Sequence, residues 1–120
     1  MERTYKMATS EEVINVAMQV LLAAGDARND AKEALEAAMN SDYELADKKI
    51  IDANKNIEKA HLYQTKVIQE EASGNGIAYS TLFTHAQDTM MTIYSEIHLA
   101  EMNIKMYKKL DERIKQLEKL

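Results

Sequence analysis

The chain has 120 residues with no proline, no cysteine and only three glycines, and its 20 acidic and 15 basic residues leave a formal net charge of −5. The lack of cysteine excludes disulfides and thiol chemistry, and the negative charge disfavours nonspecific nucleic-acid binding. Because no apolar run reaches membrane length and no signal peptide is visible, we expect a cytoplasmic protein without membrane insertion.

Strong helix formers dominate the composition and predict an all-α chain that forms one domain, residues 1–120. The first predicted helix covers residues 10–39 and begins with a capping box of Thr9 and Glu12. Gly25 predicts a kink or a close helix contact inside it. The apolar seam of this helix is rich in small residues, which permits close packing of a neighbouring helix. This seam consists of Val13, Ala17, Val20, Ala24, Ala27, Ala31, Ala34 and Ala38.

The second predicted helix covers residues 42–72 and follows a capping box in which Ser41 accepts a hydrogen bond from the backbone of Glu44. One member of its seam, Gln64, is polar and requires a hydrogen-bonding partner if it is buried. The whole seam consists of Ala46, Ile50, Ala53, Ile57, Ala60, Gln64 and Val67.

The third predicted helix covers residues 77–118 and follows a turn at ASGNG, residues 72–76. Short turns between long helices place neighbours antiparallel, so we expect an up-down-up three-helix bundle. The seam of this helix consists of Leu82, Ala86, Met90, Ile93, Ile97, Ala100, Ile104 and Tyr107.

A second apolar stripe runs along the same helix, far around it from the seam. It contains Met91, Leu99, Met102 and Met106. A helix in a three-helix bundle needs only one apolar face, so the second stripe predicts contact with another subunit. The alternative is that these methionines are exposed and bind nothing.

Asp88 continues the second stripe towards the start of the helix. If the stripe surrounds a rotation axis, copies of Asp88 meet there, and the carboxylates then need a bound cation or shared protons. Carboxylate oxygens suit Mg²⁺ or Ca²⁺. The alternative is that Asp88 faces solvent and binds nothing.

A polar strip accompanies the stripe, in and around the segment LFTHAQDTMMT, residues 82–92. Its members recur at steps of three and four: Thr81, His85, Asp88, Thr92 and Glu96. His85 therefore lies at the edge between two packing surfaces, where a partner has access and the imidazole is partly dry. The alternative, a structural or merely solvated histidine, stays open.

The antiparallel turn predicts neighbours for this histidine. Gln64 is expected to face residue 86, within reach of His85 or Thr89, and His61 to face residue 89. From its position near the seam, His98 is expected to be structural, whereas either role is open for His61.

Three strings together resemble the lactose/cellobiose-type enzyme IIA of the bacterial sugar phosphotransferase system. They are THAQDTMMT, EKAHLYQTKVIQEEASGNG and LLAAGDARNDAKEALEAAMNSDYELADKKI. The resemblance covers residues 10–118. It implies a homotrimer of three-helix protomers in which the phosphocarrier protein HPr phosphorylates His85, and the group then passes to a cysteine of enzyme IIB. It also implies that Asp88 from three chains binds one divalent metal on the trimer axis, for which we expect Mg²⁺.

Thr89 departs from the family pattern, which commonly has a second histidine directly after the aspartate. A threonine can donate a hydrogen bond to a phosphoryl oxygen but cannot carry positive charge. Thr89, Thr92 and Gln64 offer neutral donors, and Gln64 or His61 is expected to compensate for the missing histidine.

Two other functions stay open from sequence. A histidine-phosphotransfer domain of two-component signalling is also a helical bundle, but it usually carries lysine and glycine soon after the histidine, where this chain has Asp88 and Thr89. A noncatalytic helical adaptor would use the second stripe alone. The transported sugar (lactose, cellobiose or chitobiose) is not determined, because enzyme IIA contacts proteins rather than carbohydrate.

Overall fold

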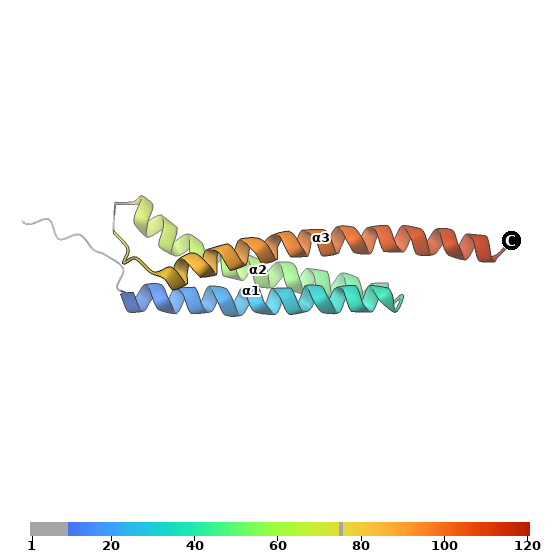
Figure 1. The fold of residues 1–120 in the computed structure, drawn as a ribbon, viewed down its shortest axis with the longest axis horizontal. Coiled ribbons are helices and arrows are strands. Elements are labelled where there is room, and N and C mark those ends of the chain that lie inside the picture. Colours follow the sequence, from blue (N-terminus) through green and yellow to red (C-terminus); the bar gives the residue numbers. More distant parts are fainter. Residues whose placement is uncertain (1–9, 75) are drawn as a thin grey trace, which may run out of the picture.

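The computed structural model describes residues 10–74 and 76–120, which form three long helices (Figure 1). These helices are α1 (Ser10–Met39), α2 (Tyr43–Ala72) and α3 (Thr81–Glu118). α2 runs antiparallel to α1 and α3 returns alongside both, which confirms the predicted all-α bundle. None of the described helices is long and apolar enough to cross a membrane.

The end of α1 differs from the prediction. Ser41 has a φ of 60° and lies in the left-handed region, so it is not the N-cap of α2. It instead ends α1 in a Schellman arrangement, in which the backbone N–H of Asp42 donates to the carbonyl of Ala37 at 2.9 Å. The predicted capping box of Ser41 is therefore wrong. Asp42 caps α2 by accepting from the backbone N–H of Leu45 at 3.2 Å. The box predicted at Thr9 lies outside the described residues.

The start of α3 also differs, because the helix begins at Thr81 rather than at residue 77. Ser80 has an extended backbone and accepts from the N–H of Phe83 at 3.1 Å, which is the arrangement of an N-cap. Phe83 is buried while Leu82 is only half-buried, so the core at this end belongs to a residue that the predicted seam omitted. At the other end of the seam, Tyr107 is exposed.

The seams of α1 and α2 are confirmed, since every residue predicted for them is buried. Gln64 is the buried polar member, with 8 % of its surface exposed. The close contact predicted at Gly25 is wrong, because a Cβ built there would meet no atom within 4 Å. α1 is thus one continuous helix that packs through small side chains against both α2 and α3.

Candidate functional site

The polar strip of α3 is turned towards α1. The guanidinium of Arg28 on α1 forms two hydrogen bonds with the carboxylate of Glu96, each 2.8 Å long. His85 precedes Glu96 by eleven residues, which is about three helical turns, so both lie on nearly the same side of α3. His85 therefore lies on the flank of α3 that borders α1.

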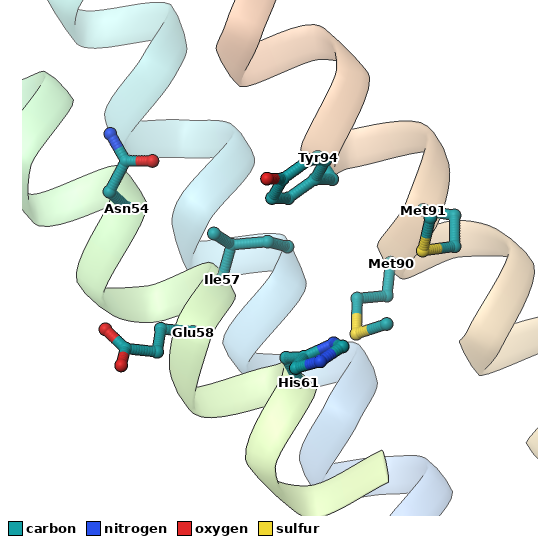
Figure 2. A pocket seen from close by; sticks show the side chains of 7 residues that line it. All are labelled: Asn54, Ile57, Glu58, His61, Met90, Met91 and Tyr94. Carbon is teal, nitrogen blue, oxygen red and sulfur yellow. The ribbon is translucent and has the colours of Figure 1, made fainter. Parts of the chain in front are cut away.

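The opposite flank of α3 borders α2 and holds a pocket of about 370 Å³ (Figure 2). Its lining residues are Asn54, Ile57, Glu58, His61, Met90, Met91 and Tyr94. The ring of His61 points from α2 towards Met90 on α3, and Tyr94 lies further along the same pocket. His61 thus lies near residues 90 and 91 of α3, about where the antiparallel turn placed it, but on the other flank from His85.

The residues predicted to surround His85 consequently divide between the two flanks of one chain. Thr89 and Thr92 follow His85 by one and two turns along the α1 side, whereas Gln64 and His61 belong to α2. Within the described residues, Gln64 forms no hydrogen bond with His85 or Thr89, so one chain does not make that pairing. A single chain brings together only part of the predicted site.

The imidazole of His85 is exposed. Among the described residues it has no hydrogen bond, ion pair or ring contact. His98 is different, because its ring packs edge to face on Tyr94 with 5.4 Å between the ring centroids. His98 is also exposed rather than part of the seam. His85 is thus the histidine of the polar strip that a docking protein can approach directly.

The two threonines beside His85 are not equivalent hydrogen-bond donors. The hydroxyl of Thr92 donates to the carbonyl of Asp88 at 2.9 Å, so its proton is already used within the helix. Thr89 is half-buried and forms no hydrogen bond through its side chain in the described part of the chain. Thr89 therefore has the free hydroxyl proton for an oxygen of a bound group.

Asp88 is exposed on the second stripe beside Met91. Residues 10–74 and 76–120 contain no group of three or more His, Cys, Asp or Glu side chains that could hold a metal ion. One chain consequently supplies a single carboxylate here. Carboxylate oxygen is the ligand that Mg²⁺ prefers, so a site at Asp88 would fit this ion only if other chains supply further ligands.

Arg28 is the site residue that sequence reasoning missed. An arginine between the buried residues Ala27 and Ala31 is a weak signal, because a charged residue beside a seam is usually solvated. Only the packing of α1 against α3 shows that Arg28 neutralises the last carboxylate of the polar strip.

A family model described as the lactose/cellobiose-specific IIA subunit of the phosphotransferase system (PTS) matches residues 15–108. The chain belongs to this family. It is 38 % identical over 104 residues to the lichenan-specific phosphotransferase enzyme IIA component of Bacillus subtilis, covering 87 % of this chain and 94 % of that protein. As an enzyme IIA of this class, it is a phosphoryl carrier and a protein-histidine phosphotransferase.

Two solved structures are similar to this enzyme IIA. The crystal structure of the cellobiose-specific enzyme IIA from Bacillus anthracis has a TM-score of 0.80 and 38 % identity, covering 88 % of this chain and 95 % of that one. The chitobiose IIA of Escherichia coli, solved in complex with HPr, has a TM-score of 0.74 and 30 % identity, covering 85 % and 99 %. The predicted resemblance to the family is confirmed.

Proposed function

We propose that His85 is the phosphorylated residue of this enzyme IIA. It accepts the phosphoryl group from phosphorylated HPr and passes it to a cysteine of the cognate enzyme IIB, in the cytoplasm, during uptake of a β-linked disaccharide. The observation that carries this assignment is the exposed imidazole of His85, which has no partner within the described residues. HPr as the donor is supported by the chitobiose IIA relative, which is seen in complex with HPr.

The surface around His85 suits a docking protein. Because Arg28 pairs with Glu96 and α1 runs parallel to α3, the residue of α1 level with His85 is about Ala17. The apolar side chains of Ile14 and Met18 on α1 are exposed near this level. An apolar rim beside a reactive polar group provides contact area for a transient partner.

The phosphoryl transfer needs little from the protein beyond position and charge. A neutral ring nitrogen of His85 attacks phosphorus in line, so the new P–N bond forms as the bond from phosphorus to the donor breaks. The transition state is loose and its charge spreads over three oxygens, so a hydrogen-bond donor beside them is favourable. Thr89 supplies that donor, one turn from His85.

The active form in this proposal is a homotrimer around the second stripe of α3. Met91, Leu99, Met102 and Met106 are each more than half exposed in one chain. In a threefold ring, the α1 flank of each protomer faces the α2 flank of the next. His61 and Gln64 of a neighbouring protomer then approach His85, which would complete the site that one chain leaves divided.

The same axis brings three copies of Asp88 together. A divalent cation, for which we propose Mg²⁺, would be held by their oxygens and would supply the positive charge that removes their mutual repulsion. Asp88 belongs to assembly in this account, because a carboxylate one turn from His85 would repel a phosphoryl group.

A phosphorylation assay tests the assignment. The protein is incubated with phosphoenolpyruvate, enzyme I and HPr, and transfer onward to enzyme IIB is followed. His85→Ala is expected to take no label and to pass none on. His98→Ala is the matched control, since it removes an exposed histidine of the same bundle that has no place in the proposed site. Label on His85→Ala at the wild-type level would refute the assignment and favour another phosphohistidine, whereas a wild-type protein that takes no label would favour a noncatalytic adaptor.

A further inference from the structure

Glu58 is an acidic residue that lines the pocket between α2 and α3 and has no partner in one chain. Its side chain is exposed and forms no ion pair or hydrogen bond within the described residues. Figure 2 shows its carboxylate turned away from the ring of His61, which lies one helical turn further along α2. If this flank contacts another subunit, Glu58 requires a cation there, because a carboxylate removed from water without a partner is costly.

Arg28 is a cation with hydrogen-bond donors to spare. Its Nε and Nη2 atoms donate to the carboxylate of Glu96, each at 2.8 Å. A guanidinium carries five N–H donors, and Nη1 of Arg28 makes no hydrogen bond within the described residues. The side chain stays 49 % exposed despite its pair with Glu96. Arg28 can therefore bind a second carboxylate that approaches from outside the chain.

Arg28 and Glu58 lie at the same height along the bundle but on opposite flanks. The ammonium of Lys108 on α3 pairs with Asp47 on α2 at 2.9 Å. From this pair, eleven residues along α2 lead to Glu58, and twelve residues back along α3 lead to Glu96. The two antiparallel helices rise equally per residue, so Glu58 lies level with Glu96 and hence with Arg28.

A threefold axis that runs along the bundle keeps each residue at its own height in every copy. In the proposed trimer, the α1 flank of one protomer faces the α2 flank of the next. We propose that Arg28 binds Glu58 of the neighbouring copy while it holds Glu96 of its own chain, so that one guanidinium joins two carboxylates across the subunit boundary. This inference rests on the proposed homotrimer, and it assigns a charged contact to α1 and α2 rather than to the apolar stripe of α3.

This contact makes Arg28 a positioning residue for the site that two protomers share. Glu58 precedes His61 by one turn and Gln64 by less than two turns on the same helix. Fixing Glu58 to Arg28 therefore also fixes the α2 segment that approaches His85 from the next protomer. A planar guanidinium suits this task, since it forms paired N–H···O bonds with carboxylates that set orientation as well as attraction.

Subunit exchange between trimers tests the contact. Unlabelled and isotopically labelled proteins are mixed, and the mixed trimers are counted over time by native mass spectrometry. Glu58→Gln is expected to raise the exchange rate about tenfold, because three copies of the contact are lost together and interface changes act mainly on dissociation. In the Arg28→Gln background the same change is expected to have no further effect. Lys32→Gln removes another exposed cation one turn away on α1 and is expected to exchange at the wild-type rate.

The rate of phosphoryl transfer from HPr gives a second readout. In single-turnover rapid quench, Glu58→Gln is expected to lower the maximal rate severalfold and to leave the half-saturating HPr concentration unchanged. The amplitude counts folded protein, so full amplitude at a slower rate separates positioning from loss of folded protein. A maximal rate equal to that of wild type would overturn the positioning role of the contact.

The outcomes separate this contact from the proposals beneath it. If Glu58→Gln exchanged at the wild-type rate, or accelerated exchange equally in the Arg28→Gln background, the contact would be overturned while the trimer and the role of His85 stood. A wild-type protein that sediments as a monomer would overturn the trimer and the contact together. A trimer with the expected exchange rates but no label on His85 would overturn the proposed function alone.

Discussion

The chemistry of single residues around His85 depends on which side chains have a free donor. Arg28 is a cation that contacts the polar strip, but its guanidinium is already bound to Glu96. Thr92 already donates to the backbone of its own helix. Thr89 is left as the neutral donor one turn from His85, in the position where the family commonly has a histidine.

Replacing the Thr89 hydroxyl tests this reasoning. Thr89→Val keeps the shape of the side chain and removes the donor, so the rate of phosphoryl transfer through His85 is expected to fall about tenfold, the effect of one hydrogen bond to a charged group. Thr92→Val is the matched control and is expected to transfer at nearly the wild-type rate. The rates are measured by rapid quench with phosphorylated HPr. Equal losses in both variants would contradict the role of Thr89.

Among the helices, α1 is the element whose packing allows the least change. Its buried face is largely alanine, and this lets α2 and α3 approach closely. Gly25 is the exception, since it is helical yet a Cβ there would meet nothing within 4 Å. Ala24, next to it, is fully buried.

Larger side chains at Gly25 and Ala24 should change the free energy of unfolding in opposite directions. Gly25→Ala is expected to raise the free energy of unfolding by about 0.5 to 1 kcal/mol, because alanine loses less backbone entropy on folding. Ala24→Leu is expected to lower it by about 1 to 3 kcal/mol through overpacking. Urea unfolding at one protein concentration measures both. A destabilised Gly25→Ala variant would mean that the backbone of α1 approaches a neighbour at that point.

The junction between α2 and the C-terminal part of α3 is expected to depend on pH. The hydrogen bond from Tyr43 lowers the pKa of Asp111, and Lys115 adds to this effect. Burial, followed by the bond to Asp111, raises the pKa of Tyr43 to about 12. The contribution of Asp111 is therefore present above its ordinary pKa of 3.8 and is lost as pH falls through the lower folded value. The contribution of Tyr43 to folding stability is present below pH 10 and is lost as pH rises towards 12.

Tyr43→Phe removes the contribution of Tyr43 and the largest cause of the lowered pKa of Asp111, while Lys115 stays beside Asp111. The stability of the variant is expected to fall less steeply than that of wild type below pH 3.8 and above pH 10, because the pKa of Asp111 is lowered less and residue 43 no longer titrates. Thermal unfolding across pH measures the two curves. Parallel curves for the two proteins would show that this pair does not link folding to protonation.

At the scale of the whole molecule, each helix buries one face in the shared core, and the second apolar stripe of α3 stays exposed. The proposed trimer covers that stripe and places Asp88 on its axis. Dialysed wild-type protein is therefore expected to retain about one divalent ion per three chains, and Asp88→Asn to retain none. A chelator should weaken the wild-type trimer but not the Asp88→Asn trimer, since only the former regains carboxylate repulsion.

Metal analysis and sedimentation with and without chelator provide the measurements. If Asp88→Asn retained as much metal as wild type, the ion would not be bound at Asp88. If the wild-type trimer did not respond to chelator, the ion would have no role in assembly.

Much of this fold is predictable from periodicity, and the exceptions have physical reasons. The seams of α1 and α2 follow from the helical repeat, so each predicted member is buried. The starts of α2 and α3 were misplaced because Ser41 resembles an N-cap but closes α1, and because the apolar residues before Ser80 resemble a continuing helix. The backbone geometry of the caps sets where both helices begin, and amino-acid composition does not predict that geometry.

The arrangement of the candidate site was less predictable. Helical spacing places His85 on an edge of α3, but three antiparallel helices can wind with either hand, and spacing does not say which neighbour borders that edge. The contact of Arg28 with Glu96 shows that the neighbour is α1. The hydrogen bond of Gln64 with His85 or Thr89 is accordingly not made within one chain.

Mapping the phosphoryl group to a residue tests the central claim most directly. The protein is phosphorylated through enzyme I and HPr, digested at alkaline pH to preserve the P–N bond, and sequenced by electron-transfer mass spectrometry. The account predicts a single phosphorylated residue, His85. A phosphoryl group on His61 or His98, with none on His85, would contradict it.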